Sequence, residues 1–255
     1  YLLHRLAFPL GDVPHLDMLH PARRLWRDPS PGVTCALTTL ERQLAGVHRV
    51  GDVPGFEIPA RYFQFVRDGD ARPLEAVLEH NRLDLLSTAL LMARALGLLR
   101  RGPAAASGPR ECLGLGRIYD RAGAVDEAAV CYREAAALVA RAGRQAEVQA
   151  EALRRLAASA RRGGRMDEAV SAWKALVDLR GCPAALRLEA REALAIHHEH
   201  RSRDLAEARQ IVLDALNDAP DARRRDAVEY RLRRLERKMA GRNPGRLMAA
   251  LDDEA

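Results

Sequence analysis

A histidine and an aspartate lie four residues apart within the stretch Leu78–Ser87, at His80 and Asp84. On a continuous helix, residues four apart share one face. A carboxylate and an imidazole on one face can hold a divalent cation and transfer a proton beside it. The spacing therefore indicates a candidate catalytic pair.

The same residues also have a purely structural interpretation. If a helix begins at Asn81 as its N-cap, Asp84 occupies the third helical position. An acid there interacts favourably with the helix dipole and with the free amide groups of the first turn. Spacing alone leaves both interpretations open.

The segments that must position these residues change along the chain: the first 70 residues predict short elements, and the residues after them predict a long helix. Prolines recur through the first 70 residues and interrupt any long helix. Asp70 followed by Pro73 is typical of a helix start, with a capping acid and a proline in the first turn. The sequence predicts a strand over 14–19, short helices over 22–26 and 38–44, and a strongly helical segment over 83–99.

A boundary follows at residues 102–109, where small residues are bracketed by glycine and proline. Beyond it the sequence repeats: residues 123–132 match residues 164–173 at an offset of 41, from 126 to 167. A third copy, residues 204–213, follows at an offset of 39, from 169 to 208. Such a period predicts paired helices in a solenoid.

The repeats combine small and bulky positions. Ala128, Ala169 and Ala208 allow neighbouring helices to approach, and Tyr132, Trp173 and Val212 lie one turn later. Residues 113–119, Leu-Gly-Leu-Gly-Arg-Ile-Tyr, supply the matching first helix. The pattern resembles the tetratricopeptide repeat, with a period of about 40 instead of 34. We expect tetratricopeptide-like repeats over 110–240, ending in a polar capping helix over 221–237, and a flexible tail over 241–255.

Four ordered blocks in the first 84 residues carry a second resemblance. They are His15-Leu-Asp-Met-Leu-His-Pro-Ala-Arg-Arg-Leu-Trp26, Leu40-Glu-Arg-Gln-Leu-Ala-Gly-Val-His-Arg49, Gly51-Asp-Val-Pro-Gly-Phe-Glu-Ile-Pro-Ala-Arg-Tyr62 and His80-Asn-Arg-Leu-Asp84. Together they resemble the C-terminal half of the YprB-type ribonuclease H-like domain, a predicted DEDD exonuclease family whose members often carry tetratricopeptide-like repeats. The expected fold is therefore mainly α: the C-terminal part of an α/β ribonuclease H-like domain over 1–101, then the solenoid.

The resemblance implies roles for individual residues. In DEDD nucleases four carboxylates bind two divalent ions that clamp the phosphodiester. Asp84 matches the fourth carboxylate, and His80 matches the residue that activates the attacking water. Asn81 and Ser87 belong to the motif without an assigned chemistry. Asp17 matches a structural or substrate-side position.

The family's other motifs are missing from this sequence. The one Asp-x-Glu is Asp252-Asp-Glu254, in the tail. Three of the four carboxylates are therefore expected upstream of Tyr1. One carboxylate cannot hold two hard cations that take about six oxygen ligands each. We expect Mg²⁺ or Mn²⁺ only together with those upstream carboxylates, and this chain by itself to be inactive.

Composition limits the remaining options. The net charge is +6, which permits an anionic partner such as nucleic acid without requiring one. The four scattered cysteines form no Cys-x-x-Cys pair, which fits a reducing, cytoplasmic setting and argues against a zinc site. The most apolar stretch, residues 85–93, is too short for a membrane span, so no membrane partner is expected. The histidines of the stretch Ile196–His200 are interpreted as solvated residues at the end of a helix, in preference to ligands of a metal ion.

Three functions follow from these observations. The first is a metal-dependent 3′–5′ exonuclease acting on a single-stranded end of DNA or RNA in the parent protein, through His80 and Asp84. The second is a protein-interaction scaffold, in which a partner binds the helical repeats. The third is a non-catalytic nucleic-acid binder, with a steep salt dependence of binding.

Overall fold

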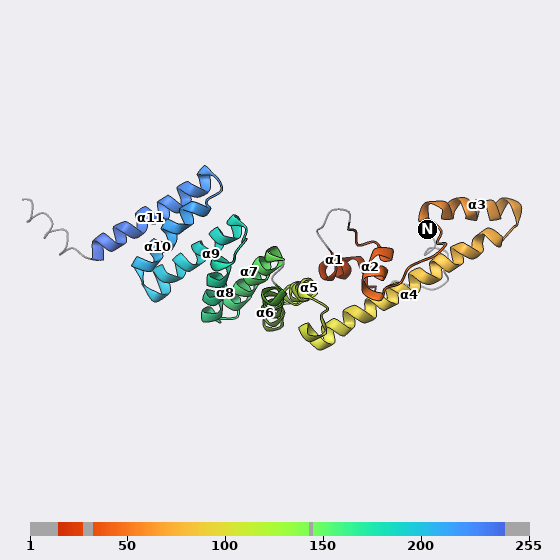
Figure 1. Cartoon of the computed structure of the whole chain (residues 1–255), viewed down its shortest axis with the longest axis horizontal. Helices are drawn as coiled ribbons and strands as arrows, with labels where there is room; N and C mark the ends of the chain where they lie inside the picture. Colours follow the sequence, from red (N-terminus) through yellow and green to blue (C-terminus); the bar gives the residue numbers. More distant parts are fainter. Residues whose placement is uncertain (1–14, 28–32, 143–144, 243–255) are drawn as a thin grey trace, which may run out of the picture. The chain divides into compact units, whose positions relative to one another are not determined.

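The structure, a computed structural model, describes residues 15–27, 33–142 and 145–242. The chain divides into two compact units, unit 1 (Tyr1–Arg101) and unit 2 (Gly102–Ala255). Every regular element in the described ranges is helical, and none is a strand (Figure 1). The expectation of a mainly α protein is thus confirmed, whereas the described part of residues 1–101 shows no sheet.

Unit 1 consists of short helices and one long helix. Its elements are α1 (Leu19–Leu25), α2 (Leu37–Ala45), the 3₁₀ turn η3 (Gly55–Glu57), α3 (Ile58–Asp68) and α4 (Arg72–Arg101). Helix α3 packs against α4, beside its N-terminal half (Figure 1). The helices predicted over 22–26 and 38–44 correspond to α1 and α2, whereas α3 has no counterpart among the sequence predictions.

Helix α4 begins where the capping signal predicted. The Asp70 carboxylate Oδ1 accepts the backbone N–H of Arg72 at 3.0 Å, and Pro73 lies in the first turn, where no amide hydrogen bond is lost. The helix then continues for 30 residues. Asn81 therefore lies inside the helix, and its interpretation as an N-cap is wrong.

A small apolar core holds α1 and α2 on α4. Ala22, Leu40 and Leu91, one from each helix, are buried together. The strand expected over 14–19 is wrong for the described residues: 15–17 are irregular and α1 begins at Leu19. The Asp17 carboxylate accepts the N–H of Leu19 at 2.8 Å, a local turn that competes with an extended conformation.

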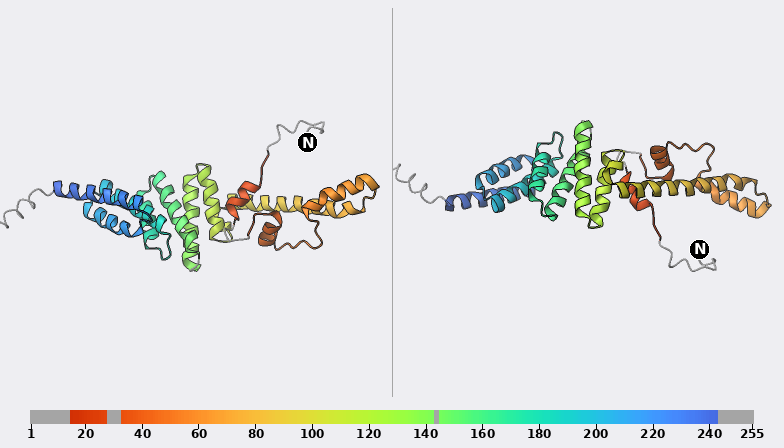
Figure 2. Two further views of the ribbon diagram at one scale, coloured as in Figure 1. Left: turned by 90° about the horizontal axis from the view of Figure 1, so that it is seen from above. Right: turned by 90° about the horizontal axis from the view of Figure 1, so that it is seen from below.

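Unit 2 is a succession of helices, each packed on the next (Figure 2). Its helices are η4 (Gly102–Ala105), α5 (Pro109–Arg121), α6 (Val125–Ala142), α7 (Ala146–Arg162), α8 (Met166–Asp178), α9 (Ala184–His197), the π-helical turn η5 (His198–Ser202), α10 (Leu205–Ala215), η6 (Leu216–Asp218) and α11 (Ala222–Arg242). The segment expected to be a linker, 102–109, contains η4 and the first residue of α5. The predicted tail lies largely outside the described residues.

The repeated positions are the ones that are buried. Ala128, Ala169 and Ala208 are fully buried, and so are the bulky residues one turn later, apart from a thin exposed edge of Trp173. Because alanine adds little bulk, α6, α8 and α10 lie close to their neighbours. The helical pairing expected from the repeats therefore rests on these side chains.

Tyr132 is the largest fully buried side chain of unit 2. Its hydroxyl group donates to the Asp120 carboxylate at 3.1 Å. Its ring lies against Gly116, where a Cβ atom would come within 2.5 Å of the ring carbon Cε1. Real Cβ atoms do not approach so closely, so the glycine in α5 leaves the space that the ring fills.

Between α9 and α10 the helix widens into the π turn η5. Glu199 in this turn is buried, and its carboxylate binds Arg234 and Lys238 of α11, with Arg231 at 3.7 Å. Burial by itself raises the pKa of Glu199, but the hydrogen bonds from Lys238 and Arg234 outweigh it and hold the pKa below its usual 4.5. No role was predicted for Glu199, whereas its buried carboxylate anchors α11, and the neighbouring His200 side chain is exposed, as expected for a helix end.

Because two of its thiols are buried, unit 2 is expected to become less stable at alkaline pH. Burial raises the pKa of Cys112 from 9.0 to about 11 and that of Cys131 to about 12. The unfolded chain therefore loses these protons first. The contribution of these thiols to the free energy of unfolding is fully present below pH 9 and is lost as the pH rises from 9 through 11.

Urea titrations at pH 7.5 and at about pH 10.5 test this, followed by Trp173 fluorescence in a Trp26→Phe background under reducing conditions. Cys112→Ala/Cys131→Ala should remove much of the difference between the two pH values. An unchanged difference in that variant would assign the alkaline loss to other groups.

Candidate functional site

Helix α4 places His80 and Asp84 on one face, as their spacing predicted. The His80 Nε2 and Asp84 Oδ2 atoms lie 3.4 Å apart. His80 is mostly buried, whereas Asp84 is partly open to solvent. The juxtaposition is confirmed, and the chemical roles of the two residues remain predictions.

A third residue, Arg49, joins this pair from the segment that follows α2. Its guanidinium is only 5% exposed, and its Nη2 donates to the Asp84 carboxylate Oδ1 at 2.7 Å. Its Nη1 donates to Asp52 Oδ2 at 3.2 Å. Its Nε donates to Glu41 Oε2 at 2.9 Å, and Nη2 also binds the second oxygen of that carboxylate. Arg49 therefore links three acids.

Asp52 fixes the histidine ring. The Asp52 carboxylate Oδ1 lies 2.7 Å from His80 Nδ1. A carboxylate can only accept, so this bond requires the hydrogen of the neutral ring to be on Nδ1. The lone pair is then on Nε2, the nitrogen that faces Asp84. Glu41, Arg49, Asp52, His80 and Asp84 form one connected set, called here the Arg49 network.

The charges in this network stabilise one another. The hydrogen bond from Arg49 lowers the pKa of Glu41, against the opposing effect of its burial. Burial raises the pKa of Asp52, but the bonds from His80 and Arg49 outweigh it and hold the pKa below 3.8. The bond to Glu41 raises the pKa of Arg49 further above its already high value. Glu41 and Asp52 are thus ionised around a permanent cation.

The described residues do not by themselves fit a divalent ion. In the described ranges, no group of three or more His, Cys, Asp or Glu side chains is arranged to hold a metal. The reason is visible at Asp84 and Asp52, whose oxygens already contact the Arg49 guanidinium. A cation at the centre of the carboxylates occupies the place where a metal ion would bind.

Sequence reasoning missed Arg49, Asp52 and Glu41 as functional residues. All three lie inside the motif blocks, yet no role followed from their spacing. One signal was present: Glu41 follows the buried Leu40 in α2 and falls on the helix's apolar stripe with Leu37 and Leu44. An acid on that stripe requires a buried partner. Asp17, in contrast, is exposed, and its carboxylate caps a local turn by accepting the N–H of Leu19.

Comparison with known proteins shows which family the segment around this site resembles. Residues 2–96 match the RNase H superfamily. The chain is also 28% identical over 235 residues to the "Uncharacterized protein YprB" of Bacillus subtilis (strain 168). No solved structure matches it. The resemblance expected from the four blocks is thus confirmed.

The RNase H segment, residues 2–96, contains the whole Arg49 network. The alignment with YprB extends further, over 90% of this chain, and therefore into the helical repeats. The chain spans about half, 54%, of the length of that relative. None of the helices in the described ranges has the length and apolar character needed to cross a membrane.

Proposed function

We propose that the protein to which this chain corresponds hydrolyses phosphodiester bonds of DNA or RNA, as a 3′–5′ exonuclease acting on a single-stranded end. The observation that carries the proposal is the His80–Asp84 pair, held at 3.4 Å inside the RNase H segment. Nuclease-like function is what that superfamily match suggests. The repeats of unit 2 are proposed to be tetratricopeptide-like.

Within this function His80 acts as the general base. Asp52 binds the Nδ1 side of the ring and thereby fixes both its orientation and its tautomer. Nε2 then carries the lone pair that can accept a proton from a water molecule bound beside the ring and Asp84. An imidazole whose Nδ1 is held by a carboxylate presents its other nitrogen to a proton donor in a fixed orientation.

Asp84 is the proposed ligand of Mg²⁺ or Mn²⁺. A divalent ion there would polarise the phosphate and activate water. With Arg49 bound to the same carboxylate, the ion would need additional carboxylates from outside the described residues. The metal requirement is therefore a property to be tested on the longer protein.

The test measures degradation of a single-stranded oligonucleotide, labelled at either end, by the longer natural protein with and without MgCl₂. Asp84→Asn and His80→Gln should each lower kcat/KM about 10- to 100-fold. Glu79→Gln is the matched control, because Glu79 is the neighbour of His80 on α4 and its exposed carboxylate pairs, within the described ranges, with Arg82 alone. Equal activity of all three variants would reject the assigned site.

The alternative, a protein-interaction scaffold on the repeats, also remains a proposal. No contact in the Arg49 network favours it over hydrolysis. If the longer protein binds single strands with a steep salt dependence but degrades none, the network is a binding site without catalysis.

A further inference from the structure

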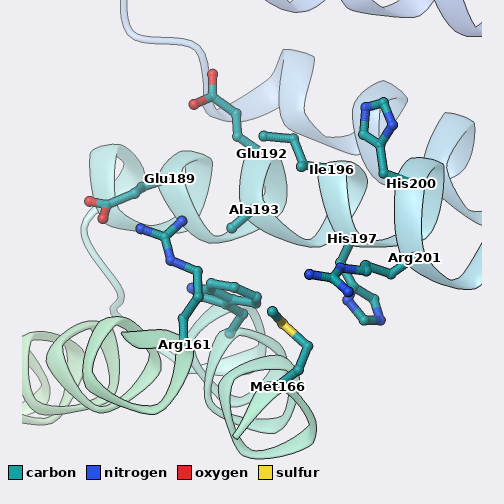
Figure 3. A pocket seen from close by; sticks show the side chains of 10 residues that line it. Arg161, Met166, Glu189, Glu192, Ala193, Ile196, His197, His200 and Arg201 are labelled. Atoms are coloured by element: carbon teal, nitrogen blue, oxygen red, sulfur yellow. The ribbon is translucent and has the colours of Figure 1, made fainter. Parts of the chain in front are cut away.

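Unit 2 contains a cavity of about 280 Å³ between the α7–α8 pair and α9 with its π turn (Figure 3). Nothing in the proposed nuclease chemistry uses it. One wall comes from the end of α7 and from α8, and the other follows the exposed side of α9 into η5. The cavity therefore lies within one compact unit.

The floor of the cavity is apolar. Met166 and Trp173 supply it from α8, and Ala193 and Ile196 supply it from α9. Ile196 is 44% exposed, which is high for a residue of this type in a packed helix. An apolar floor of this kind fits one large aliphatic side chain.

One end of the cavity is basic and lacks partners. Arg201 makes no hydrogen bond or ion pair with any residue in the described part of the chain. Beside it, the His197 Nδ1 atom is buried and has no hydrogen-bond partner (Figure 3). Burial lowers the pKa of His197, so its ring is neutral near pH 7. A buried polar atom without a partner, next to an unpaired guanidinium, is suited to an anionic group.

The opposite end is acidic. Glu189 and Glu192 line it from α9, and Arg161 reaches into the space from α7 (Figure 3). Glu189 has only a distant partner, Arg154, at 3.7 Å. The Glu192 carboxylate has no partner among the described residues, so it can accept a basic group of a ligand.

We propose that this cavity binds an extended peptide segment of a partner protein. The peptide places an acidic side chain on Arg201 and His197, a large apolar side chain on the floor, and a basic side chain at Glu189 and Glu192. From Glu192 to Arg201 is nine residues, or about 13 Å at the helical rise. An extended peptide covers that distance in about four residues. The acid and the base of the ligand are therefore four residues apart.

The charge pattern favours a peptide over a nucleic acid. A strand of phosphates would bring negative charge to Glu189 and Glu192 as well as to Arg201. Trp173 exposes only 8% of its surface and offers no stacking face to a base. A ligand that carries both signs of charge fits both ends of the cavity.

The probe is the blocked heptapeptide Ala-Glu-Ala-Leu-Ala-Arg-Ala, added to the full chain carrying Trp26→Phe. Trp173 is then the sole tryptophan and reports on the floor. We expect a saturable change of its fluorescence. Arg201→Gln should weaken binding at least tenfold through the loss of a charge-assisted bond. Replacing the peptide's glutamate by glutamine should have a similar effect.

Arg180→Gln is the matched control, because Arg180 is exposed, lies in the turn between α8 and α9 and does not line the cavity. Its affinity should stay within about twofold of the parent, and circular dichroism should show all variants folded. No saturation at about 5 mM peptide would overturn the proposal. So would equal weakening by Arg201→Gln and Arg180→Gln. Binding of a single-stranded hexanucleotide here, without peptide binding, would assign the cavity to nucleic acid instead.

Discussion

Arg49→Ala is expected to lower the free energy of unfolding of unit 1 by about 3–5 kcal/mol. Among the described residues, the side chain removed is the one counter-ion of Glu41, which is 1% exposed. A buried carboxylate left without its cation must be desolvated at full cost or take up a proton. The loss of the contacts to Asp52 and Asp84 adds repulsion between acids.

Urea unfolding measures this effect, followed by the fluorescence of Trp26 in a Trp173→Phe background. Trp26 packs against the core between α1, α2 and α4 and reports on unit 1. Arg82→Ala is the control, because this arginine of α4 is 59% exposed and solvent screens its pair with Glu79, so its loss should hardly change stability.

A double variant distinguishes the loss of stability caused by the unpaired charge from the loss caused by missing packing contacts. Arg49→Leu/Glu41→Leu removes both members of the buried pair and should be more stable than Arg49→Leu alone, because no orphaned charge remains. If Arg49→Ala were no more harmful than Arg82→Ala, the network would be a surface feature and the buried pair would not hold unit 1 together.

The second large effect is expected in unit 2. Tyr132→Ala should cost about 3–5 kcal/mol, because it removes a ring that is fully buried and a hydroxyl that binds Asp120. Tyr230→Ala provides a control of the same chemistry, since Tyr230 is 62% exposed and its loss should stay within about 0.5 kcal/mol. Thermal and urea unfolding of the two variants measure the difference.

Gly116 extends this test. Gly116→Ala should destabilise the parent by about 1–3 kcal/mol, because its Cβ meets the Tyr132 ring. In a Tyr132→Leu background the added methyl has space, and the same substitution should be nearly neutral. An equal cost in both backgrounds would mean that the ring is not what requires the glycine.

Much of the helical framework could be predicted from local signals. The repeat pattern located the buried alanines of α6, α8 and α10, because close helix packing leaves a periodic trace in sequence. Asp70 and Pro73 located the start of α4. Helix α3 was missed because a proline such as Pro59 usually breaks a helix, yet this proline lies in the first turn of α3, where proline is tolerated.

The candidate site was only half predictable. His80 and Asp84 are neighbours on one helix, so their spacing sufficed. Arg49 lies 35 residues from Asp84, and Asp52 lies 28 residues from His80. Contacts across such separations depend on how α2 and the following segment fold back onto α4. No local periodicity encodes that path, so the buried arginine became visible only with the structure.

The π turn at His198–Ser202 has a consequence for how this chain can change in evolution. A π turn contains one residue more than an α-helical turn would need, and one residue corresponds to about 100° of rotation. Ile196 and His197 precede the π turn and face the cavity, whereas Glu199 lies within the turn and faces α11. Deletion of a single residue there would keep the helix intact while turning one of these faces away from its neighbour. Gain or loss of one codon is thus the smallest genetic step that could uncouple the cavity from the terminal helix.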